Sequence, residues 1–284
     1  MTTVTVAALQ MRTGMEPGAN VEAFEALVRE AAAAGAAYVQ SPEMTGLLVR
    51  DKARLMAHIA PENEDALVSR AAELARELAI HVHVGSTAIA RPDGKVANRG
   101  FLFSPEGVRI ATYDKIHMFD VDLDNGESWR ESATYEPGAA TRVAQLPFGN
   151  LGMAVCYDLR FPQLFRAQAL SGADVLTVPA AFTRQTGEAH WHVLLRARAI
   201  ENGAFVIAAA QGGKHEDGRE TFGHSMIVDP WGRILAEADH DEPCVVMAEL
   251  DLAKVGDARR KVPNLRNARD FDIDGPAPAS GAAA

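Results

Sequence analysis

The cysteine at position 156 stands where an apolar run gives way to a polar turn. The run 152–155 leads into Cys156, and Tyr157, Asp158 and Arg160 follow before a predicted helix over 161–170. A strand-to-helix elbow of this kind exposes a nucleophile and leaves nearby backbone N–H groups free to stabilise an oxyanion. A lone cysteine is as often a buried structural residue. The local pattern therefore leaves both interpretations of Cys156 open, whereas Cys244, which has no adjoining polar turn, is interpreted as a core residue.

A nucleophilic thiol needs a base, because a free thiol with a pKa of about 8.5 is mostly protonated at neutral pH. No histidine stands at a comparable strand end, but Glu43 directly follows the predicted strand over 37–41. Glu43 would serve as a general base if partial burial raised its pKa toward neutrality. An acid at such a position is more often an exposed loop residue, so this alternative remains open.

Lys115 ends a third predicted strand, over 108–113. Its ammonium group, if it faced Cys156, would lower the pKa of the thiol and stabilise an oxyanion, although a lysine there is ordinarily a solvated edge residue. Functional sites in α/β sheets gather at the carboxyl ends of strands. We therefore expect the side chains of Glu43, Lys115 and Cys156 to converge.

The elements that must position these residues alternate between short apolar runs and Ala-rich stretches with helical spacing, which predicts an α/β layer architecture. No interior linker or repeat is visible, so we expect one domain over residues 1–270. The polar stretch 116–140 is predicted to be a functional loop. The Gly-, Pro- and Ala-rich tail over 271–284 has few side chains able to build a core and is predicted to be disordered.

Composition restricts the class of partner. The 284 residues are 48% hydrophobic and 23% charged, which is typical of a globular protein that can enclose a dry pocket. A net charge of −10 opposes binding to nucleic acid and to anionic membranes. Two cysteines are too few for a disulfide framework, and neither a signal peptide nor a membrane-spanning apolar run is visible. We therefore predict a soluble, cytoplasmic protein.

The motifs of bound cofactors are missing. No G-x-G-x-x-G or phosphate-binding loop occurs, nor any Cys-x-x-Cys or His-Glu-x-x-His. The pairs His81/His83 and His190/His192 have no third ligand in sequence and favour structural roles. We expect neither a cofactor nor a metal.

One acidic stretch comes close to a calcium loop. Asp120, Asp122, Asp124 and Glu131 fall at loop positions 1, 3, 5 and 12. Glycine stands at position 7 (Gly126) instead of the required position 6, which argues against calcium.

Three motifs together resemble the nitrilase, or carbon–nitrogen hydrolase, superfamily. They are Ser41-Pro42-Glu43, Tyr113-Asp114-Lys115 and the segment from Val155 to Pro162, and the resemblance covers residues 4–263. The segments 115–122, 130–132, 187–191 and 223–226 are most similar to the Nit branch, which contains ω-amidases and the deaminated glutathione amidase. Ser41 departs from the commoner Phe or Leu, which we expect to alter packing beside Glu43 more than chemistry.

The resemblance implies a four-layer αββα sandwich, a homodimer formed by stacked helical layers, and no cofactor. It implies that Glu43 is the general base, Lys115 the oxyanion stabiliser and Cys156 the nucleophile. Glu131 matches the second glutamate of the family. The Cys-Tyr-Asp sequence, in place of Cys-Trp-Glu, favours an amide over a nitrile as substrate.

On this interpretation, the thiolate attacks a carboxamide, Lys115 and the Tyr157 N–H hold the oxyanion, and a thioester forms as ammonia leaves. Arg160, four residues after the nucleophile, could capture a substrate carboxylate or instead form a salt bridge to Asp158 or another local acid. Further candidates for a polar rim are Arg184, His190 and Trp191, although a helical tryptophan is more often core. The predicted substrate is a small carboxylate-bearing amide, either an ω-amide or a glutathione-like γ-amide.

Other functions remain open. An N-carbamoyl amino acid amidohydrolase or an aliphatic nitrilase would use the same three residues. Two alternatives belong to other functional classes. The chain could be a catalytically silent Nit-like scaffold that binds partners, or a redox sensor built on Cys156 with Cys244 as the resolving thiol.

Overall fold

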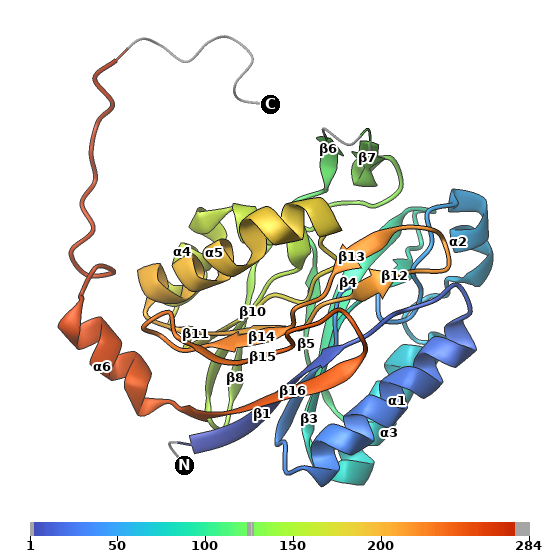
Figure 1. Cartoon of the computed structure of the whole chain (residues 1–284), viewed down its shortest axis with the longest axis horizontal. Coiled ribbons are helices and arrows are strands. Elements are labelled where there is room, and N and C mark those ends of the chain that lie inside the picture. The colour runs from blue at the N-terminus through green and yellow to red at the C-terminus, as the bar shows by residue number, and fades with distance from the viewer. Residues whose placement is uncertain (1–2, 124–125, 127, 276–284) are drawn as a thin grey trace.

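Two six-stranded sheets face each other in the computed structural model, which describes residues 3–123, 126 and 128–275 (Figure 1). The first sheet has the order β16 (Cys244–Asp251), β1 (Thr3–Gln10), β2 (Tyr38–Gln40), β3 (His81–Ala90), β4 (Val96–Phe103) and β5 (Arg109–Asp114). The second has the order β15 (Ile234–Glu237), β14 (Met226–Val228), β11 (Phe205–Ala208), β10 (Val175–Thr177), β9 (Gly149–Met153) and β8 (Arg142–Leu146). The strands β1, β2 and β3 run parallel, as do β9, β10 and β11.

Helices cover the outer face of each sheet (Figure 1). The helices α1 (Pro17–Ala33) and α3 (Ala66–Leu78) lie on the first sheet, and α4 (Pro162–Leu170) and α5 (Arg184–Asn202) on the second. In α3, Leu67, Ala71 and Leu74 recur at helical spacing and are buried, and the side chain of Asp65 caps the helix by accepting from Val68 N at 2.9 Å. The predicted four-layer αββα sandwich is confirmed.

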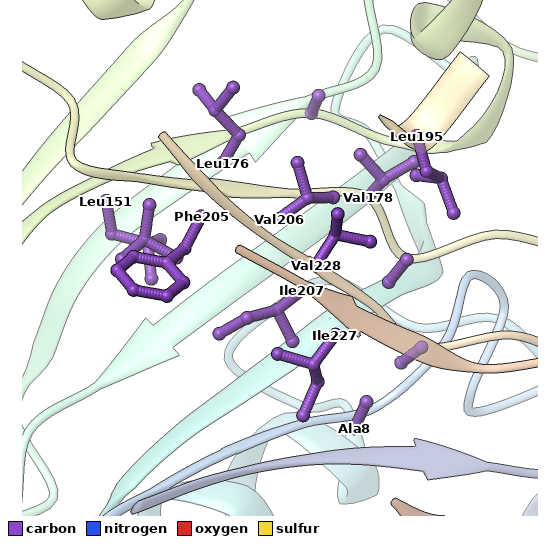
Figure 2. Packing of buried hydrophobic residues seen from close by; sticks show 14 of the residues in the cluster. Ala8, Leu151, Leu176, Val178, Leu195, Phe205, Val206, Ile207, Ile227 and Val228 are labelled. Carbon is purple, nitrogen blue, oxygen red and sulfur yellow. The ribbon is translucent and has the colours of Figure 1, made fainter. Parts of the chain in front are cut away.

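The first strand shows how alternation builds two cores. Val4, Val6 and Ala8 share a cluster with residues of the second sheet such as Leu151 and Ile227. Figure 2 shows Ala8 in this cluster. The intervening Ala7 and Leu9 pack against the helices on the other face. Because both faces of β1 are buried, its sequence is almost continuously apolar. Full burial of a valine or leucine side chain such as Val6 or Leu9 contributes about 1.5–3 kcal/mol.

Four features were not predicted from the sequence. The helices α2 (Lys52–His58) and α6 (Ala253–Lys261) and the hairpin of β12 (Gly212–Lys214) and β13 (Glu220–Phe222) lie in stretches to which no element was assigned. The stretch 116–140 is not a plain loop, because it contains β6 (Asp120–Asp122), β7 (Ser128–Arg130) and a 3-10 turn, η1 (Glu131–Ala133).

The chain beyond α6 adds no further helix or strand within the described residues. Most of the predicted tail, residues 276–284, lies outside the described residues. In the part of the chain that is described, none of the helices combines the length and the apolar character needed to cross a bilayer.

Candidate active site

Cys156 occupies the predicted elbow between a strand and a helix. It follows β9 and opens the 3-10 turn η2 (Cys156–Arg160), which leads into α4. Its backbone has a φ of 49°, in the left-handed region that non-glycine residues adopt only at a cost of about 1–3 kcal/mol. Its N–H donates to Pro179 O at 2.9 Å, which helps to hold this conformation. The strain turns the side chain out of the strand and into a cavity that Cys156 lines.

Glu43 and Lys115 reach the same cavity from the other sheet. Glu43 lies in the turn after β2, and Lys115 directly follows β5. Lys115 Nζ lies 2.9 Å from Glu43 Oε1, and a hydrogen bond joins Glu43 to the thiol of Cys156. Ala181 N donates to the other oxygen of Glu43 at 3.0 Å. The carboxyl, the ammonium and the sulfur thus meet in one enclosed space, although they are far apart in the chain.

The turn that carries Glu43 is tightly built. Met44, the next residue, has a φ of 56°, and its N–H donates to Ser86 Oγ at 3.1 Å. The hydroxyl of Ser41 accepts from Thr45 Oγ1 at 2.7 Å and from Gly85 N at 3.2 Å. Ser41 therefore contributes hydrogen bonds to the turn beside Glu43.

A second glutamate completes the surroundings of the lysine. Glu131, in the turn η1, places its two oxygens 2.8 and 3.0 Å from Lys115 Nζ. Phe119 N donates to Glu131 Oε2 at 2.7 Å and fixes the carboxylate. The predicted loop over 116–140 thus supplies a group to the site.

Asn98 links the two carboxylates and was missed by the sequence analysis. Its Nδ2 donates to Glu43 Oε1 at 2.9 Å and to Glu131 Oε1 at 3.1 Å. An asparagine within the apolar strand β4 is a visible signal, since a buried amide needs partners. In the hairpin of β4 and β5, the N–H of Lys115 donates to the backbone carbonyl of Asn98, so the strand register places Asn98 beside the lysine.

Burial and the neighbouring charges together set the direction in which the pKa of Glu43 shifts. Two carboxylates and one ammonium leave a net charge of −1 in a buried volume. Burial opposes ionisation of Glu43, but Lys115 and the hydrogen bonds from Cys156 and Asn98 hold its pKa below the usual value. The condition named for Glu43 as a base, a pKa raised toward neutrality by partial burial, is therefore not met, because a cation lies in direct contact with the carboxylate.

The lysine and the thiol shift in the same direction. Burial opposes the charge of Lys115, but Glu131 and Glu43 raise its pKa well above the ordinary value. Burial and the negative charge of Glu43 raise the pKa of Cys156 well above the ordinary value, despite Lys115. Lys115 does lower the pKa of the thiol, as expected, but burial and Glu43 outweigh its effect. The resting site holds a protonated thiol beside a carboxylate that is ready to accept its proton.

Asp158 joins the elbow to the segment that follows Lys115. It is fully buried and accepts from Val155 N at 2.9 Å, Tyr113 Oη at 2.7 Å and the backbone N–H of His117 at 3.0 Å. His117 Nδ1 lies 2.6 Å from the same carboxylate. Asp158 is therefore engaged with these groups, and the alternative of a salt bridge to Arg160 does not occur.

The cavity has a volume of about 320 Å³, within the size range of small-molecule sites. Arg160 lines it, with its guanidinium 5.2 Å from the ring centroid of Phe182 and Nη1 3.2 Å from His190 Nδ1. Within the described part of the chain, no carboxylate forms an ion pair with Arg160. This cation therefore faces the cavity without a compensating charge.

The other three predicted rim residues do not line the cavity. Arg184 forms ion pairs with Asp241 and Glu220. His190 contacts Arg160. Trp191 is buried and donates from Nε1 to a backbone carbonyl at 2.8 Å, as the core alternative predicted. None of the three positions supports direct contact with a substrate.

Cations that the sequence analysis did not single out line the cavity instead. Arg50 and Arg219 lie 4.1 and 5.0 Å from the ring centroid of Trp129. Arg219 is paired with Asp217 at 2.8 Å. These residues come from segments far apart in the chain, and no local pattern identifies them.

The calcium alternative is not supported by the described acidic residues. Asp120 accepts from Ser132, Asp122 is paired with Arg130, and Glu131 is bound to Lys115. Asp124 lies outside the described residues.

The sequence matches known enzymes over most of its length. The family described as carbon-nitrogen hydrolase matches residues 5–260. The deaminated glutathione amidase of Yersinia enterocolitica is 40% identical over 272 residues, which are 95% of this chain and 94% of that protein. The deaminated glutathione amidase of Homo sapiens is 38% identical over 269 residues, 93% of this chain and 82% of that protein.

Solved structures show the same architecture. The C. elegans NitFhit protein has a TM-score of 0.86 and 32% identity, and the match covers 94% of this chain but only 65% of that chain. A mutant of the Nesterenkonia sp. AN1 amidase has a TM-score of 0.76 and 26% identity, covering 92% of this chain and 98% of that chain. That structure carries the product of Michael addition of acrylamide at the active-site cysteine.

Proposed function

Because this chain belongs to the carbon–nitrogen hydrolase family and is an amidase, we propose that Cys156 attacks a small carboxylate-bearing amide. The observation that carries the proposal is the contact of a buried thiol, a carboxylate and an ammonium beside a cavity that also holds an uncompensated Arg160.

The first half-reaction forms a thioester. The thiol proton passes from Cys156 to Glu43 as sulfur bonds to the carbonyl carbon of the amide. The oxyanion is stabilised by Lys115 Nζ and by the N–H of Tyr157, which has no acceptor within the described part of the chain. Glu43 then gives its proton to the substrate nitrogen, the C–N bond breaks and the amine or ammonia leaves.

The second half-reaction regenerates the thiol. Water enters where the amine departed, and Glu43 takes one of its protons as the oxygen bonds to the thioester carbon. The second tetrahedral oxyanion occupies the same position beside Lys115. When the C–S bond breaks, the proton returns from Glu43 to Cys156 and the acid product is released. Glu131 holds Lys115 in position, and Asn98 holds Glu43 in position, during both half-reactions.

Arg160 supports the choice of a substrate that carries a carboxylate. A guanidinium in a partly enclosed site suits bidentate binding of a carboxylate. The curated relatives are named for deaminated glutathione, an amide with carboxylate groups. We propose two substrate types: an ω-amide, which releases ammonia, and a glutathione-like γ-amide, which releases an amine.

A pair of matched amides tests this choice. For Arg160→Met, we expect KM for a carboxylate-bearing amide to rise about 10–100-fold, because a charge-assisted hydrogen bond is lost, while KM for a neutral amide of equal length changes little. Arg142→Met, at an exposed position on β8, serves as the control. An equal change for both amides would overturn the assignment of Arg160.

The alternative functions differ in their products and in their thiol. An N-carbamoyl amino acid amidohydrolase would release carbon dioxide together with ammonia, and a nitrilase would consume a nitrile. Either result from a substrate panel would replace the amide proposal. A redox sensor depends on a thiolate, which the raised pKa of Cys156 disfavours. A silent scaffold would not require a buried thiol, carboxylate and ammonium in contact.

We also propose a cytoplasmic homodimer. Exposed apolar side chains on α5 and nearby support it: Val193 (68% exposed), Ile200 (51%) and Trp231 (50%). Val193→Glu is expected to convert the dimer into a monomer in light scattering, whereas Val108→Glu, at an exposed position in the other half of the sandwich, leaves the dimer intact. A monomeric parent protein contradicts the proposal. A reducing compartment suits a free Cys156, and fractionation of the producing cell tests this location.

A further inference from the structure

Three side chains with metal-binding atoms converge outside the active site. They are His192 on α5, His224 in the segment between β13 and β14, and Glu237, the last residue of β15. Their ligand atoms all lie within 4.8 Å of one another. We propose that these residues bind one divalent metal ion of the zinc type, which links the outer helical layer to the second sheet.

One of the ligand separations already suits a tetrahedral ion, and a second needs a small adjustment. Bonds of about 2.0–2.1 Å to nitrogen and oxygen place neighbouring tetrahedral ligands about 3.3 Å apart. His224 Nδ1 lies 3.3 Å from Glu237 Oε1, and His192 Nε2 lies 2.5 Å from the same oxygen. Admitting the ion requires His192 to move away by less than about 1 Å, which rotation of a partly exposed side chain allows. Two imidazoles and one carboxylate leave a fourth position for water.

His224 is already held in place. Its backbone is left-handed, with a φ of 56°, and its carbonyl accepts a hydrogen bond from Trp191 Nε1 at 2.8 Å. Its ring stacks on Phe222, with centroids 4.2 Å apart. Little conformational freedom of this ligand remains to be lost when a metal binds.

The charge and the exposure of the cluster also favour a cation. A histidine must be neutral to bind a metal ion. With both imidazoles neutral, Glu237 gives the cluster a net charge of −1. The side chains of His192, His224 and Glu237 are 35%, 24% and 23% exposed, so an ion can enter from solvent. The second ring nitrogen of each histidine has no protein partner within the described residues and is available to water.

The position of the cluster indicates what the ion does. The helix α5 packs over β14, and β14 pairs with β15, so the ion bridges the helix to the far edge of this sheet (Figure 1). Thr186 of α5 and Thr221 of β13 line the active-site cavity. The metal therefore clamps the elements behind one wall of the cavity and stabilises the folded chain. This inference does not depend on the chemistry at Cys156.

Zinc titration of the full-length chain, stripped of metal by a chelator, tests the site. We expect about one equivalent of Zn²⁺ to bind by calorimetry and the Tm to rise. His192→Gln and Glu237→Gln are each expected to weaken binding by about tenfold or more. His58→Gln, at an exposed histidine on α2, is the matched control and is expected to bind like the parent.

Two results would overturn the inference. One is unchanged zinc affinity in both His192→Gln and Glu237→Gln, with both variants folded by circular dichroism. The other is loss of binding in Cys156→Ala, because zinc would then be held by the active-site thiol.

Discussion

Lys115 Nζ lies 2.9 Å from Glu43 Oε1, and both side chains are almost completely buried. This contact gives Glu43 the negative charge that a proton acceptor needs and keeps the ammonium where an oxyanion forms. Glu131 adds a second carboxylate to the same lysine, so the site carries a net charge of −1. Burial and the negative charge of Glu43 raise the pKa of Cys156, so the resting thiol is protonated until a substrate arrives.

Removing the second carboxylate is expected to change both the thiol and the rate. Glu131→Gln makes the site neutral, so the pKa of Cys156 should fall and alkylation by iodoacetamide should become faster at lower pH. The kcat should fall by about 10–100-fold, because Lys115 loses the group that positions it, with a smaller change in KM. The alkylation profile and the steady-state kinetics measure these two effects. An unchanged profile would contradict the charge argument.

Asn98 is expected to act by positioning the two carboxylates. Asn98→Leu removes the donor shared by Glu43 and Glu131 at similar side-chain volume, so kcat should fall by about tenfold or more. Asn202→Leu is the matched control, since Asn202 is equally buried and, within the described residues, its side chain donates only to Arg198 O. Both variants should lose stability in urea unfolding, and only Asn98→Leu should lose turnover beyond that expected from unfolding. Equal losses of kcat would assign Asn98 a purely structural role.

Asp158 is expected to hold the nucleophile elbow. Asp158→Asn keeps one acceptor oxygen and replaces the other with an amide donor, so either Val155 N and Tyr113 Oη or His117 N loses its acceptor. This should lower the free energy of unfolding by about 1–3 kcal/mol and also reduce kcat. Tyr113→Phe removes one donor and leaves the others satisfied, so its effect should be smaller. Chemical denaturation and kinetics on both variants check this order, and a larger loss in Tyr113→Phe would reverse it.

The strand ends were predictable because they follow from chain-local signals. The apolar run that stops at Cys156 and the polar turn that follows it can be recognised from neighbouring residues alone. The same holds for the strand ends at Glu43 and Lys115. The four-layer fold followed from the family resemblance of the motifs, and the alternation of helices and strands supported an α/β class.

The remainder of the site depends on contacts between distant segments. Arg50 and Arg219 approach Trp129 from separate loops, and the helix α2 and the hairpin of β12 and β13 were not predicted. The net directions of the pKa shifts of Glu43 and Cys156 did not follow from the sequence either. They depend on the number of charges within a few ångströms, which only coordinates give.

A buried histidine is expected to make stability depend on pH. Burial lowers the pKa of His83 from 6.5 to about 3, and its Nδ1 lies 2.7 Å from Tyr38 Oη. Between these pKa values the unfolded chain binds one more proton than the folded chain. The free energy of unfolding therefore falls as the pH drops from 6.5 toward 3, by up to about 1.4 kcal/mol per pH unit from this residue.

Urea unfolding across this pH range checks the assignment. In His83→Gln the pH dependence should be shallower, because the glutamine does not titrate and can still accept from Tyr38. The exposed His58→Gln variant should retain the parent's slope. If His83→Gln and the parent show the same slope, the buried neutral state of His83 is refuted.

The role of the Cys156 thiol is measured by the rate at which Cys156→Ala releases ammonia or amine, with Cys244→Ala as the matched cysteine control. We expect Cys156→Ala to remain folded and to lose activity by at least about 10⁴-fold, while Cys244→Ala keeps the parent's activity. Turnover by folded Cys156→Ala within tenfold of the parent would contradict catalysis through this thiol.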